Sequence, residues 1–78
     1  MSPITPTNGA LGLAVRELRT SKGLSQEELA DRSGLHPTYI SGIERGLRNP
    51  TWRSLGRVCE ALEVRMSELA ALAERGGS

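Results

Sequence analysis

The sequence predicts an all-α fold, a compact domain of five short helices without strands. Apolar residues recur at intervals of three and four along several stretches, which is the spacing of one face of a helix. Gly23, Gly34 and Gly46 follow three of these stretches, at positions where glycine commonly ends a helix. The chain has 78 residues and a single cysteine, which cannot form an intramolecular disulfide and lacks companions for a zinc site. A core of Leu, Ile, Val and Ala must therefore supply the stability.

We expect the first helix at about residues 9–21. Within this range Leu11, Val15 and Leu18 recur at spacings of four and three. Residues 1–8 contain two prolines and no apolar periodicity, so they are expected to form a flexible N-terminal arm.

Two short helices joined by a tight turn are expected between Ser25 and Gly46. Ser25 with Glu28 three residues later is a capping box, which marks where the second helix of the domain begins. Gly34 suits the positive φ that often ends a helix, and Pro37 can open the next helix because its missing N–H would have no partner there. Such a pair, with small polar residues on the outer face of its second member, has the geometry of a helix-turn-helix.

The fourth helix is expected to begin near Thr51, an acceptable N-cap residue after Pro50. Apolar residues then repeat with helical spacing at Trp52, Leu55, Val58, Cys59 and Leu62. A fifth helix should cover roughly residues 66–74, whose apolar stripe helps to close the domain. The domain would then span residues 9–74, with residues 75–78 as a flexible tail.

The stretch TYISGIERG at residues 38–46, followed by RNP, resembles the phage-repressor/Cro-type (XRE-like) helix-turn-helix family of bacterial regulators. It is most similar to the controller proteins of restriction–modification systems, and the resemblance covers about Leu11 to Leu69. It implies a repressor-like domain that binds double-stranded DNA as a homodimer. It also implies that Arg19 and Glu44 form a structural pair, which would tie the first helix to the end of the third.

A catalytic function is not expected. The sequence contains no nucleophile–base pair, no P-loop and no metal-ligand spacing, so we expect neither an enzyme nor a cofactor nor a metal site. Function should therefore rest on a surface, the outer face of the helix that Pro37 opens. Side chains that read the major groove are short and carry hydroxyl or methyl groups, and Gly42 on the same helix is expected to allow a close approach of the backbone.

Two sets of DNA contacts are expected from these residue types and from the resemblance. The base contacts are Thr38, Ser41 and Arg48. The contacts to the DNA backbone are Gln26, Tyr39, Arg45, Asn49 and Arg53. Restriction controllers commonly carry an arginine at the position of Pro37, where it grips guanine. Either sequence reading here falls on Thr38 and Arg48, or the DNA sequence that is read is different.

The apolar stripe of the fifth helix exceeds what one small core needs, so we expect it to supply a two-fold interface. The candidate interface residues are Val64, Met66, Leu69 and Leu72. The formal net charge of +1 is close to neutral, but the basic residues of positions 36–57 face only one acid there, and such a separation can form a cationic surface.

The leading hypothesis is a sequence-specific transcriptional regulator that acts as a homodimer on a pseudo-palindromic operator, with an autoregulating restriction–modification controller as its narrower form. The alternatives are a phage-type repressor, an antitoxin, or a protein-interaction module that reuses the fold without binding DNA. No small-molecule effector is evident. No run of about 18 apolar residues is present, so no membrane partner is expected, and the N-terminus lacks the regions of a signal peptide, which favours the cytoplasm.

Overall fold

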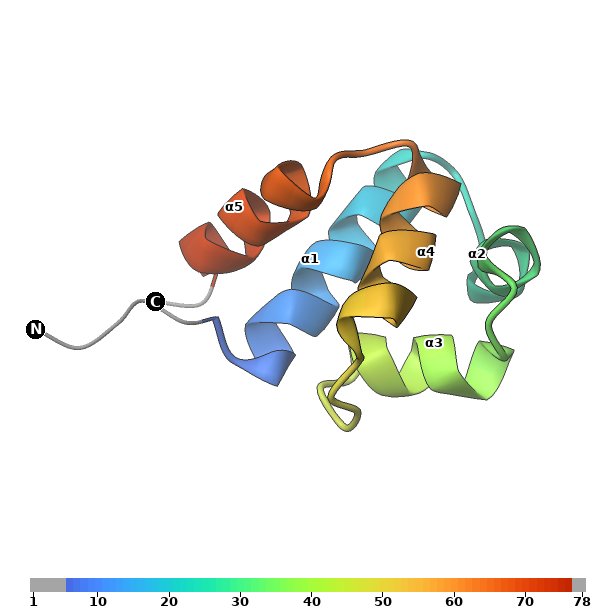
Figure 1. The fold of residues 1–78 in the computed structure, drawn as a ribbon, viewed down its shortest axis with the longest axis horizontal. Helices are drawn as coiled ribbons and strands as arrows, with labels where there is room; N and C mark the ends of the chain where they lie inside the picture. Colours follow the sequence, from blue (N-terminus) through green and yellow to red (C-terminus); the bar gives the residue numbers. More distant parts are fainter. Residues whose placement is uncertain (1–5, 77–78) are drawn as a thin grey trace, which may run out of the picture.

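The computed structural model describes residues 6–76, which form five helices and contain no strand (Figure 1). The helices are α1 Asn8–Ser21, α2 Gln26–Ser33, α3 Pro37–Glu44, α4 Trp52–Leu62 and α5 Met66–Gly76. The predicted all-α fold, with α2 and α3 as its central helix-turn-helix, is confirmed over these residues.

The first helix begins one position earlier than expected, at Asn8. Thr7 is its N-cap: the side-chain oxygen accepts a hydrogen bond from Ala10 N at 3.0 Å, which satisfies an N–H that has no carbonyl partner in the first turn. Most of the arm that we expected, residues 1–5, lies outside the described residues.

The last helix runs further than expected. α5 continues past Glu74, so that Arg75 and Gly76 are helical and not part of a tail. Residues 77–78, the remainder of the expected tail, lie outside the described residues.

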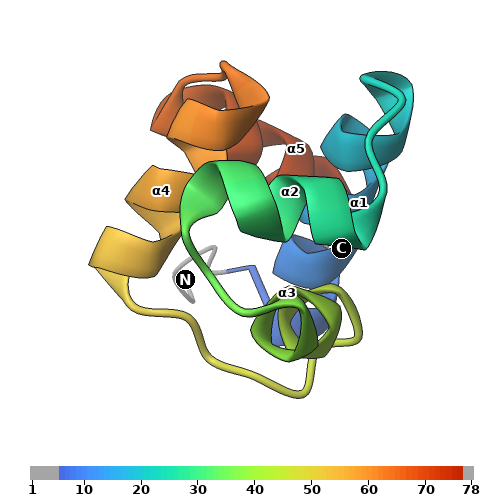
Figure 2. The ribbon, with the colours of Figure 1, turned by 90° about the vertical axis from the view of Figure 1, so that its right-hand side faces the viewer.

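Each helix packs against at least two others. Figure 1 shows α5 at one end of the domain and α2 at the other, with α1 and α4 between them. α1 packs against α3 and α5, and α2 packs against α3 and α4. Seen from the α2 end, α3 lies along one edge of the domain (Figure 2). The largest fully buried side chains are Val15, Leu29, Ile40, Ile43, Val58, Leu62 and Leu69.

Both ends of α2 follow the local signals in the sequence. Ser25 N donates to Glu28 Oε1 at 2.9 Å, and Glu28 N donates to Ser25 Oγ at 3.0 Å, so the capping box is complete. These bonds lower the pKa of Glu28, so its contribution to stability is present at neutral pH and lost as the pH falls through that lowered pKa. Gly34 ends the helix in the left-handed conformation, with φ of 74°.

α3 begins directly after the turn. His36 is its N-cap, since Nδ1 accepts a hydrogen bond from Thr38 N at 3.1 Å. Pro37 then occupies the first helical position, where no N–H is needed. The turn therefore fixes both where α3 starts and which side chains open it.

Gly12 sets how closely α1 approaches α3. It is buried, and a Cβ atom built on it would collide with the carbonyl oxygen of Ile43 and would come within 2.7 Å of the carbonyl oxygen of Glu44. The backbones of the two helices are therefore in direct contact at this point. No local signal in the sequence distinguished this residue from the other glycines.

Cys59 is buried in the core, where its Sγ lies 3.8 Å from Met66 Sδ. Burial raises the pKa of the Cys59 thiol, which keeps the thiol protonated at neutral pH. Among residues 6–76 no group of three or more His, Cys, Asp or Glu side chains is placed to hold a metal ion. None of the helices in this part of the chain has the length and apolar character needed to cross a membrane.

Candidate nucleic-acid interface

The third helix has one buried face and one open face. Ile40 and Ile43 are 0% and 1% exposed and belong to the core, as their spacing predicts. Thr38 is exposed, and Tyr39 and Ser41 are half-buried. Three of the residues expected to contact DNA thus lie on α3 with surface available, at the edge of the domain seen in Figure 2.

A buried ion pair holds the end of α3 in place. Arg19 Nε donates to Glu44 Oε2 at 2.6 Å, and Arg19 Nη2 donates to Glu44 Oε1 at 3.0 Å, so the pair is bidentate. The two side chains are 11% and 2% exposed. Arg19 Nη1 also donates to the carbonyl oxygen of Leu24 at 2.6 Å, and the bonds to Glu44 raise the pKa of Arg19. The contact that the resemblance implied is present in the structure, and it joins α1 to α3 and to the turn before α2.

Gln26 belongs to the same network. Its Nε2 donates to Glu44 Oε1 at 2.9 Å, which fixes the side chain at the start of α2 against the end of α3. An amide nitrogen carries two N–H groups, so this bond leaves one donor for a phosphate. Gln26 was expected only as a DNA contact, and its bond to Glu44 could not be foreseen because the two residues are far apart in the chain.

Arg48 lies against α3 although it belongs to the loop that follows. Its backbone N–H and that of Leu47 donate to the Gly42 carbonyl oxygen at 3.2 and 2.9 Å. Its Cγ lies 2.5 Å from where a Cβ of Gly42 would be. Its Cζ lies 5.9 Å from the centroid of the Tyr39 ring, within the range of a cation–π contact. Gly42 is therefore buried beneath Arg48, and the expectation that Gly42 is open to the DNA backbone is wrong.

The other polar residues expected at the DNA follow the open face of α3 in the chain. Arg45 is the C-cap residue of α3, and Arg53 lies in the first turn of α4. Both are exposed, as is Asn49 in the loop between them. Glu27 and Glu28 place two negative charges in the first turn of α2, which makes the cations after α3 the better anchors for phosphate.

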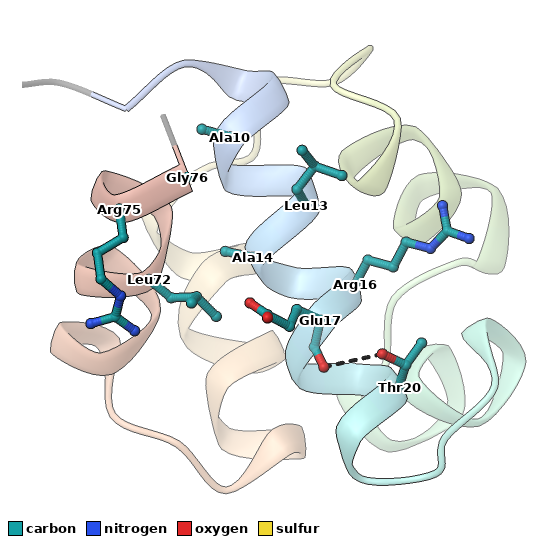
Figure 3. A pocket seen from close by; sticks show the side chains of 9 residues that line it. All are labelled: Ala10, Leu13, Ala14, Arg16, Glu17, Thr20, Leu72, Arg75 and Gly76. Atoms are coloured by element: carbon teal, nitrogen blue, oxygen red, sulfur yellow. Dashed lines mark hydrogen bonds between the residues drawn. The ribbon is translucent and has the colours of Figure 1, made fainter. Parts of the chain in front are cut away.

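The residues expected at a two-fold interface do not share one surface. Leu69 is 1% exposed and belongs to the core, so it offers little surface of its own, although it lies at the floor of the hollow that Met66 lines. Val64, Met66 and Leu72 are half-buried. Leu72 lines a hollow between α5 and α1, where the charged side chains of Arg16, Glu17 and Arg75 also lie (Figure 3).

Met66 lines a different hollow, which is almost wholly apolar. Trp52 and Leu55 of α4 and Leu11 of α1 also line it. Trp52 is 76% exposed, although it belongs to the apolar series of residues 52–62, whose members Val58, Cys59 and Leu62 are buried. The sequence could not separate these surfaces, because the spacing of apolar residues does not tell which neighbouring helix covers them.

Comparisons with known proteins agree with this geometry. The helix-turn-helix family model matches residues 15–69. The control protein C.BamHI of Bacillus amyloliquefaciens is 46% identical over 59 residues, which cover 74% of this chain and 73% of that protein.

Solved structures of restriction–modification controllers are also similar. That of C.AhdI from Aeromonas hydrophila has a TM-score of 0.79 and 45% identity, covering 80% of this chain and 94% of that one. That of the C.Esp1396I tetramer in complex with its natural 35 base-pair operator has a TM-score of 0.82 and 34% identity, covering 97% of this chain and 96% of that one. The chain therefore belongs to the phage-repressor/Cro-type helix-turn-helix family of transcriptional regulators.

Proposed function

We propose that this protein is a sequence-specific DNA-binding regulator that acts as a homodimer on a pseudo-palindromic operator. One observation carries the proposal: α3 offers an open polar face with Arg45 at its C-terminal end and Arg48 beside it, while the Arg19–Glu44 pair fixes its orientation. A helix held in this way enters the major groove as a rigid element. Such a regulator acts where the DNA of the cell lies, which in a bacterium is the cytoplasm.

The residues of this face divide into two roles. Thr38 and Ser41 carry hydroxyl groups suited to base edges, and the Thr38 methyl group suits the methyl group of thymine. Tyr39, Gln26, Arg45, Asn49 and Arg53 would contact phosphate or sugar, which positions the domain without reading sequence. Arg48 is the positively charged residue among the three proposed base contacts, since Pro37 has no hydrogen-bond donor in its side chain.

Within this class we propose an autoregulating restriction–modification controller. Its support is the similarity to C.BamHI over most of both chains and to the C.AhdI structure. A methyltransferase gene beside this one would agree with that role. Neighbouring prophage genes or a toxin gene would favour a phage-type repressor or an antitoxin instead.

The two kinds of DNA contact can be separated by mutation. Thr38→Ala should weaken binding to the preferred duplex by about 1–3 kcal/mol and should change binding to scrambled DNA little. Arg45→Gln should weaken binding to both duplexes and lower the salt slope by about one unit for each phosphate that the variant no longer neutralises. The measurement is a titration of each variant at several salt concentrations, with a duplex that the wild-type protein selects from a random-sequence pool.

Arg65→Gln is the matched control for charge. Arg65 is exposed in the connection between α4 and α5, which Figure 1 shows on the side of the domain away from α3. This variant should bind both duplexes like the wild type. Equal loss on both duplexes for Thr38→Ala would show that Thr38 reads no base, and selection of no sequence at all would refute the proposed function.

The homodimer should form through the apolar hollow that Met66 shares with Trp52. This hollow is lined by residues of α1, α4 and α5 and by none of α3, so a two-fold axis beside it would leave both α3 helices free to meet successive major grooves roughly 34 Å apart. A tryptophan that is 76% exposed beside other apolar side chains is typical of a surface that a partner covers. The hollow that contains Leu72 is less suited, because charged side chains surround it.

Trp52→Glu should therefore convert the dimer to a monomer, because burying an unpaired carboxylate between two apolar surfaces is costly. Leu72→Glu is the comparison in the other hollow that α5 borders and should leave the dimer intact. Sedimentation velocity over a range of protein concentrations measures both. If Leu72→Glu is a monomer and Trp52→Glu is still a dimer, the interface lies at the hollow that Leu72 lines.

A further inference from the structure

We propose that Gly42 and Tyr39 are positioning residues that hold Arg48 as part of the reading surface of α3, where its guanidinium recognises a guanine. This inference rests on the proposed function. It states how the loop that follows α3 supplies a cation that the sequence of α3 itself lacks, and which residues hold that cation in place.

The stem of Arg48 occupies the space that the missing side chain of Gly42 leaves. A Cβ atom at position 42 would lie 2.5 Å from Arg48 Cγ, 3.3 Å from Nε and 3.5 Å from Cδ. The nearest of these atoms belongs to the inner part of the side chain and not to its flexible end. Any larger residue at position 42 would therefore force Arg48 into a different rotamer.

The guanidinium then points back along α3. Tyr39 precedes Gly42 by three residues, which is about one turn of helix, and Arg48 Cζ lies 5.9 Å from the Tyr39 ring centroid. The Tyr39 ring itself packs against the core, so it offers a fixed support. The charge of Arg48 thus lies beside the N-terminal half of α3, which is the half that contacts base edges in a helix-turn-helix.

The packing of Arg48 on Gly42 explains why a glycine is found at a position where it is otherwise unfavourable. Glycine inside a helix costs roughly 1 kcal/mol relative to alanine, and Gly42 lies in the middle of α3. The backbone also ties the loop to the same place, because the Gly42 carbonyl oxygen accepts the N–H groups of both Leu47 and Arg48. An arginine held in one rotamer loses less entropy when it forms a bidentate contact with guanine O6 and N7.

Gly42→Ala is the test, because the added methyl group fills the space that Arg48 occupies while every charge is kept. It should leave the thermal unfolding midpoint unchanged or higher, as expected for alanine within a helix. Its affinity for the duplex selected by the wild type should fall by about tenfold or more, with no change in affinity for scrambled DNA or in salt slope. Gly56→Ala is the matched control, since Gly56 also lies inside a helix and a Cβ there would meet nothing within 4 Å.

A double-mutant cycle decides whether Gly42 acts through Arg48. In the Arg48→Ala background, adding Gly42→Ala should change affinity for the selected duplex less than about twofold, since the residue that it displaces is absent. If Gly42→Ala costs the same in both backgrounds, the glycine meets DNA directly and the proposal is wrong. Wild-type affinity of the Gly42→Ala variant would also overturn it.

A measurement without DNA keeps this inference separate from the proposed function. In the free protein the NMR signal of Arg48 Hε should be shifted by the Tyr39 ring. The signal should move to the position of an exposed arginine in both Gly42→Ala and Tyr39→Leu. If the Arg48 Hε signal is unshifted in the wild type, or if Gly42→Ala does not change its position, then Gly42 and Tyr39 do not hold Arg48. Failure of the wild type to select any duplex would refute the function instead.

Discussion

Replacing Glu44 by glutamine should lower the free energy of unfolding by about 3 kcal/mol or more. The Glu44 side chain is 2% exposed and accepts hydrogen bonds from two nitrogens of Arg19 and from Gln26. Glutamine keeps the shape but removes the charge and turns one acceptor into a donor. The guanidinium of Arg19, which is 11% exposed, would then be left without its counter-charge. A small domain has only about 5–15 kcal/mol of stability, so this loss is a large part of the total.

Urea denaturation followed by circular dichroism at one fixed protein concentration measures this effect, because dimerisation makes apparent stability depend on concentration. Trp52 fluorescence is a poor reporter of unfolding, since Trp52 lies on the surface where we propose that two copies meet and its signal would also follow dissociation. Glu60→Gln, on the exposed surface of α4, is the control and should lie within about 0.5 kcal/mol of the wild type. An equally small change for Glu44→Gln would mean that the pair is not needed to hold α3 against α1.

A partial rescue should also be observed. Replacing both members of a buried pair by apolar residues is often neutral, so Arg19→Met with Glu44→Leu should recover much of the loss. Gln26 is half-buried and can turn its amide to water when its acceptor is gone. The single variant Glu44→Gln keeps the bond from Arg19 to the Leu24 carbonyl oxygen, and the double variant loses it. If the double variant is the less stable of the two, that bond contributes more to stability than the ion pair.

Gly12→Ala should destabilise the domain by about 2 kcal/mol, against the intrinsic preference of a helix for alanine. The added Cβ would collide with the backbone of α3 at Ile43, and no side-chain rotation can relieve that contact. α1 and α3 would have to separate, which also stretches the ion pair between Arg19 and Glu44. DNA binding should weaken as well, because α3 would change its angle to the rest of the domain.

Gly56→Ala gives the opposite sign in the same denaturation experiment. A Cβ at Gly56 meets nothing within 4 Å, so the variant should gain up to about 1 kcal/mol from helix preference alone. The difference between the two glycine variants isolates the close approach of α1 to α3. Should Gly12→Ala be as stable as Gly56→Ala, the two helices are not in the direct contact that the structure places there.

The sequence by itself determined the features that depend on nearby residues. The capping box of Ser25 and Glu28 and the left-handed Gly34 are set by bonds and dihedral angles within a few residues, so both ends of α2 could be predicted. The buried face of α3 followed from the spacing of Ile40 and Ile43. The Arg19–Glu44 contact came from the resemblance, since no local rule joins residues that are 25 positions apart.

Only the tertiary structure decided which surfaces meet. Nothing in the sequence distinguishes Gly12 from the other eight glycines, and only the structure shows that it allows α1 to touch the backbone of α3. Helical spacing placed Trp52 in an apolar series, but no helix of the described residues covers it, because helical periodicity assigns residues to a face without naming the neighbour. Arg48 could be named as a DNA contact from its type. That it lies over Gly42 beside Tyr39 depends on a loop folding back onto α3, which neither residue type nor helical spacing specifies.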